Sequence, residues 1–138
     1  TMNSYKTLLK VTNVEEMIAI LDCLPDILVK NCMMFMMRDG IKPMWEDKAN
    51  SNGGCFSYKI NNNHVKQVWD QLCCMVVGNS LSNDPKFIKK ITGITISPKK
   101  SFCIIKIWMS DCTEQNVRKI RPIDNLSSHG CLFKKHLS

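Results

Sequence analysis

Eight cysteines and three histidines are the residues of this chain with the widest chemical range, because both types bind metals and serve in nucleophilic catalysis. No two cysteines are separated by two residues, so the paired-ligand knuckle of a structural zinc site is missing. Several cysteines lie in apolar segments, where a free thiol packs as a small hydrophobic group. We expect reduced thiols, with no metal and no cofactor. A cysteine nucleophile paired with His64, His129 or His136 is the less favoured alternative, since nothing nearby marks an activated thiolate.

A second group of interest is the dipeptide Trp45-Glu46, which lies in an irregular loop at 39–47. Neither helical nor strand periodicity describes this loop, so burial alone gives a large aromatic ring little reason to be there. The alternative is that Trp45 covers the edge of the core. Basic residues form the third group, with Lys99 and Lys100 in a turn between two expected strands, where they bind an anion or are simply solvated.

The length of 138 residues fits a single domain at 1–138, long enough to bury about two thirds of its unfolded surface. Nineteen basic and twelve acidic residues give a net charge of +7, which suggests a polyanionic partner. No apolar run approaches the roughly 18 residues of a membrane span, and no secretory leader is evident. We therefore expect a soluble, basic domain of the cytoplasm, without a membrane partner.

Strand and helix patterns alternate along the chain. Strands are expected at 5–11, 32–37, 55–60, 93–97 and 102–109. A first helix follows Asn13, which with Glu16 forms a capping pattern, and Pro25 closes it. A second helix begins after 61–63, places Trp69 in the core and ends at Gly78. A short helix is expected at 113–119, followed by an irregular basic tail. The pattern indicates an α+β fold with an antiparallel sheet.

The loop and its flanks carry a resemblance to a known family. Residues 40–47 read GIKPMWED, and Ala49-Asn50 and Gly53-Gly54 follow. This pattern resembles the signature of the eukaryotic translation initiation factor 4E family, whose members bind the 7-methylguanosine cap of messenger RNA. Residues 12–16, 69–78 and 105–112 agree with the family in order and spacing. The resemblance implies a curved antiparallel sheet with about three helices on its convex face and the cap on its concave face.

Carried over to this chain, the resemblance implies a cap site with a stacking ring, a base-reading carboxylate and phosphate-binding lysines. Trp45 would stack on the cationic methylated guanine, and Glu46 would accept hydrogen bonds from guanine N1 and N2. Trp108 matches the tryptophan near the methyl group. Alternation along 102–109 puts Lys106 on the same face as Trp108. The phosphate-binding residues are then Lys99, Lys100 and Lys106.

The chain departs from the family pattern at the first stacking ring. An ungapped alignment puts Thr1 there, and Tyr5 would serve only with a shortened loop. We expect an N-terminally short member that holds the base with one ring, at a cost of about 1–3 kcal/mol. A phosphate-binding lysine of the family aligns with Ile104, and Lys106 would replace it. A Ser-His pair of the family's last loop aligns weakly with Ser128-His129.

The expected convex face differs too. Members of the family recruit the scaffold factor 4G or 4E-binding proteins through a helix-in-groove contact anchored on a tryptophan of the first helix. That position aligns with Ile18, and a groove position aligns with Asp70. A charged group in an apolar groove must be desolvated, which disfavours the usual ligand. Scaffold recruitment is therefore doubtful.

These observations predict a divergent, non-enzymatic cap-binding protein that acts in or regulates translation initiation, with capped mRNA as its partner. The alternative is a protein-interaction module that kept the fold and lost cap affinity. An enzyme acting on the cap ranks last, because the sequence shows no clustered carboxylates and no metal-ligand pattern.

Overall fold

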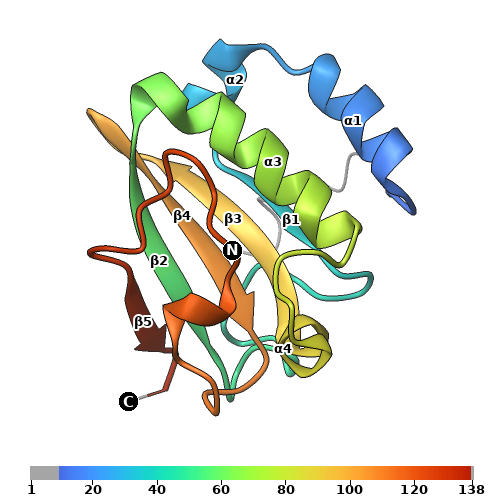
Figure 1. Ribbon diagram of the computed structural model, residues 1–138, viewed down its shortest axis with the longest axis vertical. Helices are drawn as coiled ribbons and strands as arrows, with labels where there is room; N and C mark the ends of the chain where they lie inside the picture. The colour runs from blue at the N-terminus through green and yellow to red at the C-terminus, as the bar shows by residue number, and fades with distance from the viewer. Residues whose placement is uncertain (1–9, 138) are drawn as a thin grey trace.

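The computed structural model describes residues 10–137, which form a five-stranded antiparallel sheet with helices packed on one face (Figure 1). The strand order is β1-β3-β4-β2-β5, so the central strand is β4, with β3 and β2 on either side of it. The elements in chain order are α1 Val14–Asp22, α2 Asp26–Asn31, β1 Met34–Met37, β2 Gly54–Asn61, the 3-10 turn η2 Asn62–His64, α3 Val65–Val77, α4 Pro85–Lys90, β3 Ile91–Pro98, β4 Phe102–Met109, the 3-10 turn η3 Val117–Lys119 and β5 Leu132–Lys135.

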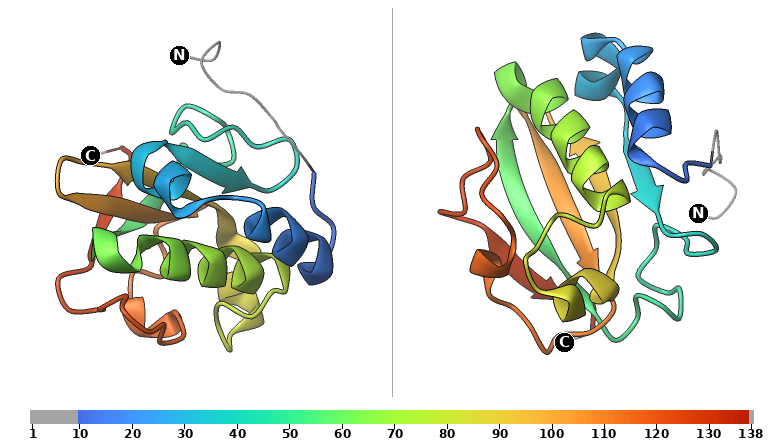
Figure 2. Two further views of the ribbon diagram at one scale, coloured as in Figure 1. Left: turned by 90° about the horizontal axis from the view of Figure 1, so that it is seen from above. Right: turned by 45° about the vertical axis from the view of Figure 1, so that its right-hand side comes forward.

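The longest helix, α3, lies across the sheet, and α1 and α2 lie beside it (Figures 1 and 2). Its buried side chains include Trp69, as its helical spacing with Val65 and Leu72 predicts. They pack against alternate residues of the strands, which form one continuous core. The expected α+β fold, a curved antiparallel sheet with helices on its convex face, is confirmed.

The first helix begins as its capping pattern predicts. The Asn13 side chain accepts a hydrogen bond from the backbone N–H of Glu16 at 2.9 Å. The Glu16 carboxylate in turn accepts the backbone N–H of Thr12 at 3.1 Å, one residue before the cap. The Thr12 hydroxyl also donates to this carboxylate, and the two hydrogen bonds hold the pKa of Glu16 below its usual value. The helix therefore begins at the residue that the sequence indicates.

Five expectations differ from the structure. Pro25 ends the first helix but opens α2, and the strand expected at 32–37 is shortened to β1. The polar loop around Pro85 contains α4, which Asp84 caps by accepting the backbone N–H of Lys86 at 3.0 Å. The helix expected at 113–119 is only the single turn η3, and the irregular tail contains strand β5. These elements have three to six residues, too few to show a period.

The strand expected at 5–11 lies mainly outside the described residues, and Lys10 and Val11 are not in a strand. Thr1 and Tyr5, the two positions considered for a first stacking ring, also lie outside them. None of the helices within residues 10–137 has the length and apolar character needed to span a bilayer.

Candidate functional site

The loop between β1 and β2 is held in shape by its own polar side chains. The Asp47 carboxylate accepts the backbone N–H of Lys42 at 2.9 Å and that of Ala49 at 3.0 Å. Both hydrogen bonds favour the ionised form, so the pKa of Asp47 lies below its usual value. A carboxylate used in this way closes the loop on itself across its tip.

Asn50 attaches the same loop to the sheet. Its side chain is completely buried, and its Nδ2 donates to the carbonyl oxygens of Lys42 at 3.0 Å and Met44 at 2.9 Å. Its Oδ1 accepts the hydroxyl of Thr92, in β3, at 2.7 Å. A buried amide with these three partners fixes both the shape of the loop and its position on β3.

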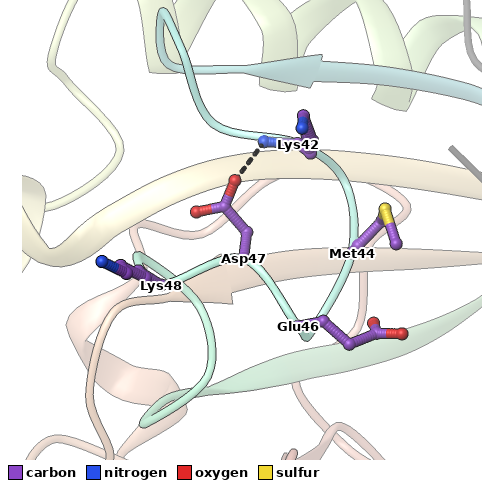
Figure 3. Close-up of a pocket in the computed structure, with 5 residues that line it drawn as sticks. All are labelled: Lys42, Met44, Glu46, Asp47 and Lys48. Atoms are coloured by element: carbon purple, nitrogen blue, oxygen red, sulfur yellow. Dashed lines mark hydrogen bonds between the residues drawn. The ribbon is translucent and has the colours of Figure 1, made fainter.

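Trp45 and Glu46 lie at the exposed part of this anchored loop. Trp45 is 46% exposed, and the Glu46 carboxylate forms no hydrogen bond or ion pair among the described residues. A hollow of about 350 Å³ beside the loop is lined by Lys42, Met44, Glu46, Asp47 and Lys48 (Figure 3). In Figure 3 the side chains of Glu46 and Lys48 extend in opposite directions.

The strand registers assign the sheet residues to two faces. Paired residues of antiparallel strands point to the same side, and successive residues alternate. Phe56 and its partner Phe133 touch in the core, with ring centroids 4.9 Å apart, so their neighbours point away from the helices. We call that opposite side the open face. It consists of Phe35, Met37, Cys55, Ser57, Lys59, Asn61, Gly93, Thr95, Ser97, Phe102, Ile104, Lys106, Trp108, Leu132, Lys134 and His136.

Trp108 lies on the open face and is only 8% exposed. Its indole Nε1 donates to the hydroxyl of Thr95 at 3.0 Å, which fixes the orientation of the ring from the neighbouring strand. On the other side of β4, Trp108 pairs with Cys55 of β2. Burial raises the pKa of the Cys55 thiol to about 12, so it is a neutral packing group and no nucleophile.

His136 completes the surroundings of Trp108 from the C-terminal end of the chain. Its backbone N–H donates to the carbonyl oxygen of Gly53 at 3.0 Å, and its imidazole lies against the indole with ring centroids 5.0 Å apart. Its Nε2 is 3.8 Å from the Cys55 sulfur. Burial, together with the charge of Lys106, lowers the pKa of His136 and favours the neutral imidazole.

The structure brings Trp45, Glu46 and Trp108 to the same end of the sheet. Asn50 ties the loop to Thr92, and the next residue of β3, Gly93, pairs with Trp108. Lys106 shares the open face with Trp108, two residues away, as the alternation predicts. Figure 2 shows the loop on the side of the sheet opposite α3.

Lys99 and Lys100 lie apart from this group. They occupy the turn before β4, whose first residue, Phe102, is six residues and about 20 Å from Trp108 at the rise of an extended strand. They can therefore contact only the far part of a ligand held at Trp45 and Trp108. His129 lies in a turn where its backbone N–H donates to the hydroxyl of Ser127, whereas the imidazole against Trp108 is that of His136.

Two partners of Trp108, Thr95 and His136, were not assigned to this site from the sequence. Thr95 is a polar group whose burial depends on tertiary contacts, so no local pattern marks it. His136 follows β5, which is too short and too basic to be predicted as a strand. The alternation of Leu132, Lys134 and His136 was the available signal.

The helix-covered face contains the two other positions that the sequence marked. Ile18 is 46% exposed on α1. Asp70 forms an ion pair with Lys66 one turn earlier on α3, and the Lys66 ammonium also donates to the carbonyl oxygen of Leu21 at 3.0 Å. Burial raises the pKa of Asp70 despite the hydrogen bond and charge of Lys66, which act in the opposite direction. Asp70 is therefore already partly desolvated in the described structure.

A curved antiparallel sheet with helices on its convex face and an exposed Trp-Glu pair on an anchored loop defines an α+β domain with a candidate ligand site. Comparison with known proteins assigns this domain more narrowly. The family described as "Eukaryotic initiation factor 4E" matches residues 2–130, so the chain belongs to that family. The expected resemblance is confirmed over nearly the whole chain.

Individual relatives agree with this assignment. A translation initiation factor 4E homologue of Acanthamoeba polyphaga mimivirus is 40% identical over 62 residues, covering 45% of this chain and 23% of the relative. The initiation factor 4E of Eremothecium gossypii is 30% identical over 114 residues, covering 79% of this chain and 52% of the relative. The chain thus spans about half the length of the Eremothecium relative and less of the viral one.

Solved structures of the family share the fold. The crystal structure of a schistosome initiation factor 4E complexed with m7GpppG and a 4E-binding protein has a TM-score of 0.64 at 21% identity, covering 72% of this chain and 56% of the other. A C. elegans eIF4E-3 in complex with the 4E-binding protein Mextli and a cap analogue has a TM-score of 0.63 at 22% identity, covering 72% and 57%. At these identities the likeness establishes the common fold.

Proposed function

We propose that this protein binds the 7-methylguanosine 5′ cap of mRNA without catalysing a reaction, and acts in or regulates translation initiation in the cytoplasm. The observation that carries this proposal is the exposed pair Trp45 and Glu46 on a loop fixed by Asp47 and Asn50. The family membership of the chain supports it, as do the cap ligands named for two structural neighbours.

In this proposal each side chain of the pair has a separate task. The methylated guanine carries a delocalised positive charge, so it favours the face of the Trp45 indole, an interaction of about 1–2 kcal/mol when desolvated. Glu46 accepts hydrogen bonds from N1 and N2 of the base, which an adenine ring does not offer. Because the loop backbone is fixed before binding, little conformational entropy is lost when the ligand enters.

Trp108 and the lysines take the remaining parts of the ligand. Trp108 is held by Thr95 and partly covered by His136, so it presents only a small part of its ring to a methyl group at N7. Lys106, on the same face, is the nearest predicted cation for the triphosphate. Lys99 and Lys100, at the far end of β4, would contact the more distant phosphates.

A fluorescence titration with 7-methylguanosine triphosphate tests the proposal. We expect quenching on binding, and weaker binding of unmethylated guanosine triphosphate, which lacks the positive charge of the methylated ring. Replacing Trp45 by alanine should cost about 1–3 kcal/mol of binding free energy, the scale for removing an aromatic ring under a base. Trp45→Phe, which keeps a ring, should lose less.

Glu46→Gln tests the carboxylate, with Glu15→Gln as the matched control. Glu15 is an exposed carboxylate on the first turn of α1, an element separate from the loop. We expect Glu46→Gln to weaken binding at least tenfold, because the charge-assisted hydrogen bonds are lost, and Glu15→Gln to leave it unchanged. Absence of binding by the unaltered protein at low salt would refute cap binding and favour the interaction-module alternative.

We further propose that the helix-covered face does not recruit the usual scaffold helix with high affinity. Ile18 offers a smaller apolar contact than the tryptophan expected at that position, and Asp70 with Lys66 places an ion pair on α3. The 4E-binding proteins named with the structural neighbours show that this fold accepts such partners elsewhere. A partner of another sequence, or competition for caps, is then the consequence.

Calorimetric titration with a scaffold-derived helix peptide tests this second proposal. We expect weak or undetectable binding to the unaltered protein. Ile18→Trp should strengthen binding, whereas a tryptophan at the exposed α2 position, Ile27→Trp, serves as the control for added apolar surface. Tight binding of the peptide to the unaltered protein would contradict the argument from Ile18 and Asp70.

A further inference from the structure

The charges on the open face are all of one sign. Its cations are Lys59 on β2, Lys106 on β4 and Lys134 on β5, and His136 follows β5. None of the open-face residues within the described part of the chain is an aspartate or glutamate. None of these three lysines forms an ion pair there, although Lys59 lies over the Phe102 ring at 4.2 Å.

The β2 residues between Lys106 and Lys134, Cys55 and Ser57, have small side chains. Lys134 is level with Cys55, and Lys106 is level with Ser57, so the two lysines lie diagonally across β2. With strands about 4.8 Å apart and a rise of about 3.4 Å per residue, their Cα atoms are separated by roughly 12 Å. Two lysine side chains of this spacing can approach anions that lie above Cys55 and Ser57.

Lys59 extends the same surface toward the other end of β2. It lies four residues from Cys55 on the same face, about 14 Å along the strand. The registers put the Cα atoms of Lys59 and Lys134 roughly 14 Å apart, so a ligand that contacts both together with Lys106 must carry several anionic groups in a row. A chain of successive phosphates can contact them all, and its negative charge complements a surface without carboxylates.

From this arrangement we propose that the open face binds the phosphate backbone of the single-stranded RNA that follows the cap, with Lys134 and Lys59 as contacts outside the cap-binding motif. The proposal rests on the proposed cap binding for the position of the first nucleotide. The RNA then passes from the end of the sheet that holds Trp45 and Trp108 over β2. Its recognition is independent of sequence, because phosphate contacts carry no base information.

Lys134→Gln is the central variant, and Lys135→Gln is its matched control. The two residues are neighbours on β5, carry the same charge and are both exposed, but Lys135 points to the other side of the sheet. The probes are 7-methylguanosine triphosphate and a capped octaribonucleotide. Affinities are measured by fluorescence anisotropy or quenching between 50 and 200 mM salt, ranges chosen because phosphate contacts weaken steeply there.

We expect Lys134→Gln to weaken binding of the capped octamer about three- to fivefold and to leave the mononucleotide affinity unchanged within twofold. The slope of log affinity against log salt for the octamer should become shallower by about 0.7, the value for one lost phosphate contact on a single strand. Lys135→Gln should leave both the octamer affinity and the slope unchanged. Lys59→Gln should behave as Lys134→Gln does.

Two results would overturn the proposal. If Lys134→Gln and Lys135→Gln weaken octamer binding equally, only the general positive field acts. If Lys134→Gln weakens the mononucleotide as much as the octamer, Lys134 belongs to the triphosphate site instead.

An uncapped octamer of the same sequence separates this proposal from the failure of cap binding. If the mononucleotide does not bind the unaltered protein, the cap proposal fails. The uncapped RNA then tests whether the open face binds RNA. A loss of its affinity in Lys134→Gln but not in Lys135→Gln supports an RNA-binding open face, and equal affinities in the two variants refute it.

Discussion

The imidazole of His136 packs against the indole of Trp108, with ring centroids 5.0 Å apart and ring planes inclined by 38°. This contact joins the C-terminal end of the described chain to the central strand β4. The Cys55 thiol lies on one side of the imidazole, and the Lys106 ammonium acts on it from β4. The neutral ring suits this position better than the charged one, because burial and Lys106 both disfavour protonation.

The lowered pKa of His136 predicts a pH dependence of stability. In the unfolded chain the imidazole takes up a proton near its ordinary pKa of about 6.5. In the folded protein uptake occurs only at lower pH, so the unfolded state binds more protons in this window. Folding stability should therefore be complete above about pH 6.5 and decrease as the pH falls below it. Urea unfolding at pH 7.5 and pH 5.5 measures the difference.

The histidine at position 129 supplies the control for this prediction. His129 is exposed in a turn, and His129→Gln should keep the loss of stability between the two pH values. His136→Gln should reduce that loss, because the imidazole whose pKa is lowered by folding is then absent. Other groups that contribute to the loss are the same in both variants. An unchanged loss in His136→Gln would show that the contact with Trp108 does not depend on the charge of the imidazole.

The hydrogen bond from Trp108 to Thr95 gives a second prediction. Thr95→Val keeps the shape of the side chain but removes the acceptor, which leaves a buried indole N–H without a partner. We expect a loss of about 1–3 kcal/mol in the free energy of unfolding, measured with urea. Thr95→Ser keeps the hydroxyl and should restore the tryptophan environment, seen in the fluorescence spectrum. A loss of stability in Thr95→Ser but not in Thr95→Val would mean that the methyl group, not the hydroxyl, matters.

Much of the fold was predictable because its longer elements have clear periods. The 13-residue helix α3 and strands β2 and β4, of eight residues each, show their apolar alternation directly in the sequence. The short elements α2 and α4 do not, since six residues provide less than two helical turns. The strand β5 is defined by pairing with β2, a contact that no local pattern encodes.

The candidate site divides in the same way between local and tertiary information. Trp45 and Glu46 stand out because a large aromatic ring in a polar loop contradicts the simple burial pattern. Lys106 and Trp108 share a face through local alternation. The partners of Trp108 come from elsewhere, with Thr95 on β3 and His136 beyond β5, so only the folded sheet brings them together.

Asn50 provides a third prediction, which separates loop shape from loop chemistry. Asn50→Ala removes three hydrogen bonds and leaves two carbonyl oxygens and the Thr92 hydroxyl without this partner. We expect about 2–4 kcal/mol of lost stability. The affinity for 7-methylguanosine triphosphate should fall at least tenfold at a temperature where the variant remains folded, because Trp45 and Glu46 lose their fixed position.

Asn52→Ala is the control for this loop variant. Asn52 is exposed in the same loop, and its side chain forms no hydrogen bond among the described residues. It should lose neither stability nor affinity. Thr92→Val removes only the link to β3 and should give an intermediate loss of affinity. If Asn50→Ala destabilised the fold but bound the nucleotide normally, the loop would not need its anchor for ligand binding.

The ion pair between Lys66 and Asp70 gives the last prediction. The side chains are only partly exposed, and Asp70 Oδ1 is buried without a hydrogen-bond partner in residues 10–137. Lys66→Met leaves the carboxylate without its cation and should destabilise the protein by about 1–3 kcal/mol, less than for a fully buried pair. Asp70→Asn should be nearly neutral, because burial already raises the pKa of this carboxyl and disfavours its charged form.

The double variant Lys66→Met with Asp70→Asn decides whether the cost comes from the unpaired charge. If it does, the double variant should regain most of the stability that Lys66→Met loses, and urea unfolding should show coupling between the two sites. Additive losses would show instead that the Lys66 stem and its hydrogen bond to the Leu21 carbonyl oxygen hold α1 against α3. In that case the ion pair would be incidental to the packing of the helices.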